Sequence, residues 1–243
     1  FLQQMKDHTM ILINYTRSLS VNNVYDLLFS DLEGTKLYDK FLKKHIQGQS
    51  VLEFASGTGD LLNLLDQKYD VLGVDIDEEM LDKAILKYPH LKSKMVLGDF
   101  MHFEDTKRYD TCVCVGDSLN YMTTFEDMDA FVKTSSALSD HIIVDFHHPY
   151  RLEEFDIPYY EEGTVEDLDY AYQIEKDEDR LVHTINFLDG HFEQVIQWVF
   201  MPETLIERFE NKGYQAYVFT DFDNEGILKE GEKIMVVFSK VNS

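Results

Sequence analysis

Two acidic residues and two glycines stand close to points where short apolar runs end. Glu53 lies within the run Val51–Phe54, Gly57 and Gly59 follow that run, and Asp75 closes a second one. Glycine lets a backbone approach a ligand closely, because a Cβ atom there would collide with it. An ionised carboxylate only accepts hydrogen bonds, so Asp75 suits the two hydroxyl groups of a ribose. These residues predict a binding loop for a cofactor that contains adenosine.

The spacing of the glycines argues against a dinucleotide. A dinucleotide-binding loop reads G-x-G-x-x-G, and no third glycine follows Gly59 at the required distance. An acid four residues before Gly57 would repel a pyrophosphate, whereas Glu53 suits a positively charged group such as an α-amino group. S-adenosyl-L-methionine (SAM) combines adenosine, an amino acid tail and a sulfonium. A nucleotide-dependent oxidoreductase is therefore the disfavoured alternative.

The elements that must position these residues alternate along the chain. Short apolar runs alternate with segments of helical periodicity, which predicts a parallel sheet covered on both faces. The expected fold is a Rossmann-like, doubly wound α/β fold with a mostly parallel sheet of seven strands. Two amphipathic helices are expected between residues 24 and 47. The expected strands are 51–54, 71–74, 95–97, 111–115, 141–146, 214–220 and 234–241, and the further helices are 60–67, 77–88, 125–138 and one that Pro202 opens.

The period of the pattern changes after Pro149. The segments 169–175, 180–188 and 190–200 alternate polar and apolar residues, which predicts a three-stranded antiparallel meander. We expect a single domain over residues 1–243, with an N-terminal helical cap at 21–48. Residues 150–201 are expected to form an insertion that covers the carboxyl edge of the sheet as a lid.

Composition narrows the classes of partner. Lys and Arg number 22 against 46 Asp and Glu, a net charge of −24, which disfavours nucleic acid and favours a small or cationic substrate. Cys112 and Cys114 alternate on one strand and indicate neither a disulfide framework nor a zinc site, so a reducing cytoplasm is expected. No run approaches the length of a membrane span. No metal site is predicted, and a monomer and a homodimer are both left open.

Four motifs in order carry a resemblance to a known family. EFASGTG resembles the E/D-x-G-x-G-x-G loop of the class I SAM-dependent methyltransferases, and GVDIDEEML, GDF and DSLNY are similar to its later motifs. The closest similarity is to a small bacterial subgroup with YDLLFSD and DSLNY. Two departures stand out: Ala55 replaces the first loop glycine, and LSDH replaces the Pro-Gly-Gly turn before the fifth strand.

The resemblance implies roles for the cofactor-binding residues. Glu53 would meet the methionyl amino group, and Asp75 would bind the ribose unless it merely caps the next helix. Asp99 would accept from the adenine amino group unless it only forms an Asx-turn. Tyr25 would lie over the methionine carboxylate, Ile76 beside adenine, and the amide of Phe100 would contact the adenine ring. The whole set of cofactor-binding residues that the resemblance implies is Tyr25, Glu53, Ala55, Gly57, Gly59, Asp75, Ile76, Asp99, Phe100, Asp117 and Ser118.

The acceptor is expected beyond the fourth and fifth strands. Asp117, Tyr121 and His147 are the candidate catalytic residues, although Asp117 could equally cap the helix that follows it. His183 and His191 are expected on a solvated strand face, and the two cysteines in the core. The predicted reaction transfers a methyl group from SAM to nitrogen or oxygen of a small molecule and leaves S-adenosylhomocysteine (SAH). The alternative is a catalytically silent protein that binds SAM or SAH.

Overall fold

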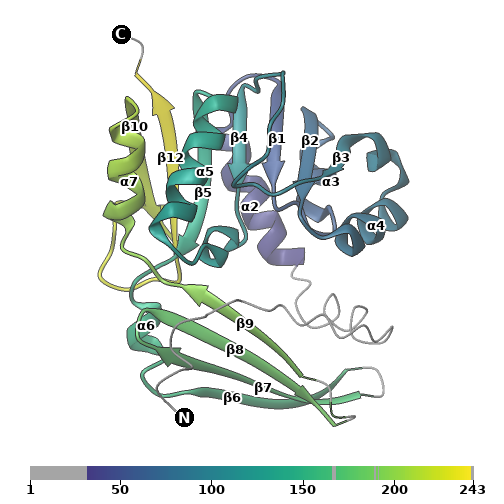
Figure 1. Cartoon of the computed structure of the whole chain (residues 1–243), viewed down its shortest axis with the longest axis vertical. Helices are drawn as coiled ribbons and strands as arrows, with labels where there is room; N and C mark the ends of the chain where they lie inside the picture. Colours follow the sequence, from purple (N-terminus) through teal and green to yellow (C-terminus); the bar gives the residue numbers. More distant parts are fainter. Residues whose placement is uncertain (1–31, 166–167, 189, 191, 242–243) are drawn as a thin grey trace. The chain divides into compact units, whose positions relative to one another are not determined.

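The computed structural model describes residues 32–165, 168–188, 190 and 192–241 (Figure 1). Within them an eight-stranded sheet has the strand order β11-β10-β12-β5-β4-β1-β2-β3. The strands β1 to β5 are parallel to their neighbours in that group, and β12 joins β5 in the antiparallel sense. The strands are β1 Ser50–Phe54, β2 Asp70–Asp75, β3 Met95–Leu97, β4 Thr111–Cys114, β5 His141–His147, β10 Tyr214–Thr220, β11 Asn224–Glu225 and β12 Lys233–Lys240.

Helices cover both faces of this sheet and enclose two hydrophobic cores. Alternate strand residues point to opposite faces, so Cys112 and Ile142 pack in one core while Val113 and Ile143 pack in the other. This arrangement confirms the expected doubly wound α/β fold. The helices are α2 Leu32–His45, α3 Asp60–Leu65, α4 Glu78–Lys87, α5 Phe125–Leu138, α6 Arg151–Glu154 and α7 Pro202–Glu210, with 3-10 turns η1 Pro89–Lys94 and η2 Ser118–Tyr121.

The register of the central strands brings their carboxyl ends to one level. Phe54 of β1 pairs with Val74 of β2 on one side and with Cys114 of β4 on the other. The loops that follow β1, β2 and β4 therefore leave the sheet side by side. This shared edge is where ligands bind in open α/β sheets.

Two expectations about this part of the fold are wrong. The sheet has eight strands instead of seven, because the two-residue strand β11 pairs with β10. A break between two helices was expected near Gly34 and Thr35, but α2 runs through both residues without interruption. The rest of the expected cap, residues 21–31, lies outside the described residues.

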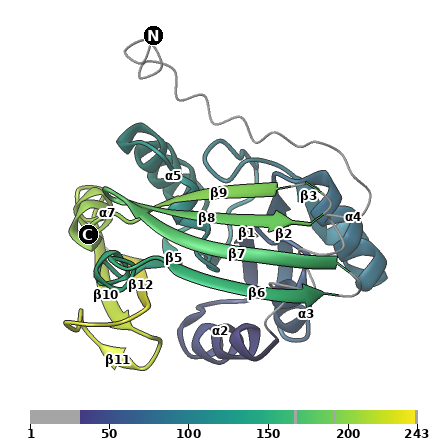
Figure 2. The ribbon, with the colours of Figure 1, turned by 90° about the horizontal axis from the view of Figure 1, so that it is seen from below.

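A second sheet is inserted between β5 and α7. Its strands are antiparallel in the order β6-β7-β8-β9, which corrects the predicted three strands to four. The missed strand β6 reads YYEEGTV, which has no apolar alternation, and its described side chains are mostly exposed. Figures 1 and 2 show this sheet lying across the carboxyl ends of the parallel strands. The strands are β6 Tyr159–Val165, β7 Leu168–Asp177, β8 Arg180–Phe187 and β9 Phe192–Trp198.

The described helices include none that is both long and apolar enough to cross a membrane.

Candidate active site

The glycine loop leaves β1 through a left-handed backbone. Ala55, Gly57 and Gly59 have φ values of 53°, 51° and 77°, and α3 begins directly after them. A Cβ atom on Gly59 would lie 3.2 Å from the Cβ atom of Ala84, so this glycine also serves helix packing. A Cβ atom on Gly57 would meet nothing within 4 Å. The space beside Gly57 is therefore open to a ligand.

Glu53 is the buried acid of this loop. Its side chain lines a pocket of about 180 Å³ together with Tyr38, Ala55 and Gly116. The residue is 4% exposed, and its Oε2 atom has no hydrogen-bond partner among the described residues. Burial, and then the negative charges of Asp75 and Asp60, raise the pKa of Glu53 well above its ordinary value. A buried carboxyl oxygen without a partner is costly, and a cationic ligand group would satisfy it.

Asp75 ties the end of β2 to the glycine loop. Its Oδ2 accepts a hydrogen bond from the Gly57 amide at 2.7 Å, and its Oδ1 accepts one from the Asp77 amide at 2.9 Å. Burial raises its pKa although both amides act in the opposite direction. The helix-capping alternative is wrong for Asp75, because Asp77 is the residue that caps α4. Binding of ribose by Asp75 stays a prediction.

The residues expected around adenine lie further along the same edge. Ile76 is 68% exposed, so it is not a core residue. Asp99 accepts from the Met101 amide at 2.9 Å, which is the Asx-turn considered as the alternative, and its Oδ2 lies 2.7 Å from His102 Nδ1. The ring of Phe100 packs within the protein. Adenine binding by these residues stays a prediction, and Tyr25 lies outside the described residues.

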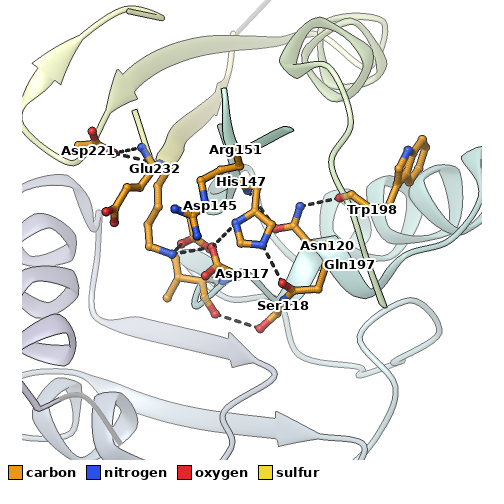
Figure 3. A network of polar contacts seen from close by, with 12 residues as sticks. Asp117, Ser118, Asn120, Asp145, His147, Arg151, Gln197, Trp198, Asp221 and Glu232 are labelled. Atoms are coloured by element: carbon orange, nitrogen blue, oxygen red, sulfur yellow. Dashed lines mark hydrogen bonds and ion pairs between the residues drawn. The ribbon is translucent and has the colours of Figure 1, made fainter. Parts of the chain in front are cut away.

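A buried polar network stands at the ends of β4, β5 and β12 (Figure 3). Asp117, with a φ of 62°, places its Oδ1 at 2.5 Å from Lys233 Nζ and donates its amide to Asp145 Oδ1 at 3.0 Å. Lys233 also lies 3.6 Å from Asp145 Oδ2, to which the Tyr38 hydroxyl donates. Sequence reasoning missed Lys233, Asp145 and Tyr38.

This network fixes the charge of Asp117. Burial alone would raise its pKa, but the charge and the hydrogen bond of Lys233 contribute to an opposite effect that outweighs burial and lowers it. The side chain makes no capping hydrogen bond to η2, so the capping alternative is wrong. An ionised carboxylate with a lowered pKa is a weak proton acceptor, which leaves Asp117 better suited to orient or stabilise a neighbouring group.

His147 lies beside Asp117 at the end of β5. Its Nε2 is 2.7 Å from Gln197 Oε1, and its Nδ1 is 3.6 Å from Asp117 Oδ1. Because Gln197 Oε1 is an acceptor, this contact assigns the proton to Nε2 and leaves the lone pair on Nδ1. Burial lowers the pKa of His147, and Lys233 and Arg151 act in the same direction. His147 is therefore a neutral imidazole with one nitrogen available as a base.

Asn120 joins this site to the antiparallel sheet. Its Oδ1 accepts from the His147 amide at 3.0 Å, and its Nδ2 donates to the Trp198 carbonyl at 2.7 Å. The Ser118 hydroxyl donates to the Val115 carbonyl at 3.0 Å. Tyr121, the third candidate catalytic residue, is 46% exposed at the end of η2.

His148 and the two cysteines have structural positions outside the proposed chemistry. His148 uses both ring nitrogens, donating to the Leu228 carbonyl at 3.1 Å and accepting from the Tyr150 amide at 3.0 Å, which is a structural arrangement. Cys112 and Cys114 are buried free thiols, which confirms the expectation that they belong to the core.

The expectation of a solvated His183 is wrong. Its Nδ1 lies 2.6 Å from the Tyr172 hydroxyl, and its Nε2 is buried without a partner. Burial, and then the nearby His147, lower the pKa of His183 to about 4. The antiparallel sheet partly buries this side chain and fully buries its Nε2 atom, and strand alternation alone could not tell which face is covered. His191 lies outside the described residues.

Comparisons with known proteins match the central part of the chain to a methyltransferase domain. Residues 51–140 match the model of a family described as a methyltransferase domain, a segment that includes Glu53, Asp75 and Asp117. A search of curated proteins finds no match.

Solved structures share the fold over nearly the whole chain. A SAM-dependent methyltransferase from Clostridium acetobutylicum has a TM-score of 0.78 at 19% identity, covering 91% of this chain and 98% of that one. A sugar N-methyltransferase from Streptoalloteichus has a TM-score of 0.71 at 16% identity, covering 90% and 93%. A SAM-bound amino pentose methyltransferase from Micromonospora echinaspora has a TM-score of 0.64 at 15% identity, covering 91% and 98%.

The fold and the matched segment define a methyltransferase. Residues 51–140 form the methyltransferase domain, and nearly the whole chain shares the fold of SAM-dependent methyltransferases.

Proposed function

We propose that this methyltransferase transfers the methyl group of SAM to the amine nitrogen of a small molecule. The observation that carries the proposal is the pocket lined by Glu53 and Gly116. Glu53 Oε2 has no partner among the described residues, and Gly116 directly precedes Asp117, which lies beside His147. An amine acceptor is supported by a neutral base beside a carboxylate. The sugar and amino pentose methyltransferases among the structural neighbours support the same class of acceptor.

Residues of the glycine loop fit the cofactor. When bound, SAM supplies a methyl group on a positively charged sulfur, which leaves as the thioether of SAH. Glu53 would pair with the α-amino group, because its Oε2 is buried and has no partner within the described chain. Asp75 would bind the ribose with the acceptor capacity that its two amide contacts leave unused. Ile76, Asp99 and the amide of Phe100 would line adenine.

On the acceptor side, His147 acts as the general base. An amine that gains a methyl group becomes positively charged and must lose a proton, which His147 accepts at Nδ1. Asp117, 3.6 Å from this nitrogen, stabilises the imidazolium that forms. Alignment of the amine with the methyl group at about 3–3.5 Å contributes roughly 7–11 kcal/mol to lowering the barrier. Ser118 and Tyr121 complete the proposed wall around the acceptor.

Residues 150–201 act as a lid in this proposal. Several contacts hold the antiparallel sheet to the rest of the site. Besides the contact of Gln197 with His147, Arg180 Nη2 donates to the Thr123 carbonyl at 2.9 Å, and Asn120 Nδ2 donates to the Trp198 carbonyl. A covered site excludes water, which protects the reaction from hydrolysis. We further propose a cytoplasmic enzyme, since both cysteines are free thiols, and a bacterial one, because YDLLFSD and DSLNY resemble a bacterial subgroup. Residues 21–48 are proposed as the N-terminal cap.

A radiolabelled-methyl assay tests this function. Wild type is incubated with labelled SAM and small amines, and the methylated products are separated from the donor. We expect transfer to at least one amine, and we expect His147→Gln, which retains a polar group toward Gln197 but lacks Nδ1, to lower kcat by about 10²–10⁴-fold. Binding of SAH without transfer to any amine would contradict the proposal and favour a silent binding protein.

A further inference from the structure

The inner face of the antiparallel sheet carries His183. Strand register pairs His183 with Val195 and Leu181 with Gln197, so His183 and Gln197 lie on the same face. Gln197 contacts His147 at 2.7 Å, which shows that this face is turned toward the proposed acceptor site. His183 therefore belongs to the covering wall of that site, although it comes from a different sheet than His147.

The two ring nitrogens of His183 differ in their hydrogen bonding. Nδ1 contacts the Tyr172 hydroxyl at 2.6 Å, and the two rings stack with centroids 6.1 Å apart and an interplanar angle of 26°. This double contact fixes the orientation of the imidazole. Nε2 is buried and finds no hydrogen-bond partner in the described part of the chain. Buried polar atoms are nearly always paired in folded proteins, so a rigidly held nitrogen without a partner indicates a ligand.

The surroundings of His183 favour a neutral ligand-binding group. Burial, and then His147 and Arg151, lower the pKa of His183, and these effects outweigh Asp117 and the nearby Gln197, which raise it. One nitrogen of a neutral imidazole donates a hydrogen bond and the other accepts one, so a hydroxyl, which can do both, can pair with Nε2 in either tautomer.

We propose that His183 Nε2 hydrogen-bonds the methyl acceptor and selects acceptors that carry a second polar group besides the reacting amine, as amino alcohols and amino sugars do. His147 then accepts the proton from the nitrogen that is methylated, while His183 hydrogen-bonds a hydroxyl or amine elsewhere on the same molecule. The antiparallel sheet thereby contributes specificity as well as cover. This inference rests on the proposed function.

Two matched variants separate recognition from structure. His183→Asn keeps a polar atom near the position of Nδ1, where Tyr172 binds, but removes Nε2. Thr184→Ala changes the next residue of β8, whose side chain lies on the opposite face, and serves as the control. A structural role for His183 predicts a lower melting temperature and weaker SAH binding for His183→Asn. A recognition role predicts that neither changes.

The test compares two probe amines, D-glucosamine and cyclohexylamine, which differ in their hydroxyl groups. We expect wild type and Thr184→Ala to favour D-glucosamine in kcat/KM, and His183→Asn to lose that preference by about tenfold through a higher KM, with kcat and SAH affinity retained. The inference would be overturned if His183→Asn kept the kcat/KM preference for D-glucosamine. It would also be overturned if this variant had both a lower melting temperature and a weaker affinity for SAH. If wild type binds SAH but methylates neither amine, the proposed function fails and the inference fails with it.

Discussion

Lys233 Nζ lies 2.5 Å from Asp117 Oδ1, although 116 residues separate the two along the chain. The ion pair joins β12 to the loop after β4. It stabilises the ionised form of Asp117 and so makes this carboxylate a weak proton acceptor. The neighbouring His147, which Gln197 holds at Nε2, keeps its second nitrogen available. The proposed roles of Asp117 and His147 therefore depend on a lysine that is remote in sequence.

Replacing Lys233 by Met should raise the pKa of His147. The substitution removes a positive charge that disfavours the imidazolium, and it leaves Asp117 without its principal counter-ion, so both effects stabilise the protonated ring. NMR titration of the histidine side chains measures the change. Lys240→Met, at the exposed end of the same strand, is the control. An unchanged titration of His147 would show that the ion pair does not control this base.

Acidification should destabilise the protein partly through His183. Unfolded histidine binds a proton near pH 6.5, whereas the pKa of His183 in the fold is lowered to about 4. Between these values the unfolded chain binds more protons, so the free energy of unfolding contributed by His183 is complete above the upper value and is lost as the pH falls. Urea unfolding at pH 7 and pH 5 should show a smaller loss for His183→Asn than for wild type. Equal losses would contradict the burial described for this imidazole.

Ala55→Gly should stabilise the protein. Ala55 holds a φ of 53°, a left-handed conformation that costs a residue with a Cβ atom roughly 1–2 kcal/mol and costs glycine little. Glycine gains entropy in the unfolded chain, which offsets part of this relief, so we expect a net rise of only about 0.5–1 kcal/mol in the free energy of unfolding. Denaturant titration measures it, with SAH affinity as a check that the loop is intact. A lower free energy of unfolding would mean that the Ala55 methyl group makes contacts that outweigh the strain.

Glu53→Gln should separate ligand binding from folding. The amide is nearly isosteric with the carboxyl group but carries no charge, so it relieves a buried group whose pKa is raised by burial. We expect the ligand-free protein to unfold at the same or a higher urea concentration, while SAH affinity falls by about 10–100-fold because a charge-assisted contact is lost. Glu210→Gln, exposed at the end of α7, is the control. Full SAH affinity in Glu53→Gln would remove the assigned contact with the amino group.

Local sequence signals were sufficient for the central parallel strands and for the position of the glycine loop after β1. Glu53, Gly57 and Asp75 are recognisable because they stand close to strand ends, and parallel strands must bring those ends to one edge. The same logic located Asp117 and His147, which follow or close β4 and β5.

Contacts that depend on distant pairing could not be read from the sequence. Lys233 meets Asp117 only because β12 inserts antiparallel beside β5, and nothing near Lys233 in the sequence signals this. His183 was placed on the wrong face, since a strand's alternation defines two faces without saying which one a second sheet covers. The strand β6 escaped detection because it lacks apolar alternation.

Calorimetric titration of the protein with SAH, SAM and NAD tests the central claim most directly. The account predicts micromolar affinity for SAH and SAM, about −8 kcal/mol, no binding of NAD, and loss of most of that affinity in Asp75→Ala. Binding of NAD, no heat with SAH, or undiminished affinity in Asp75→Ala would contradict it.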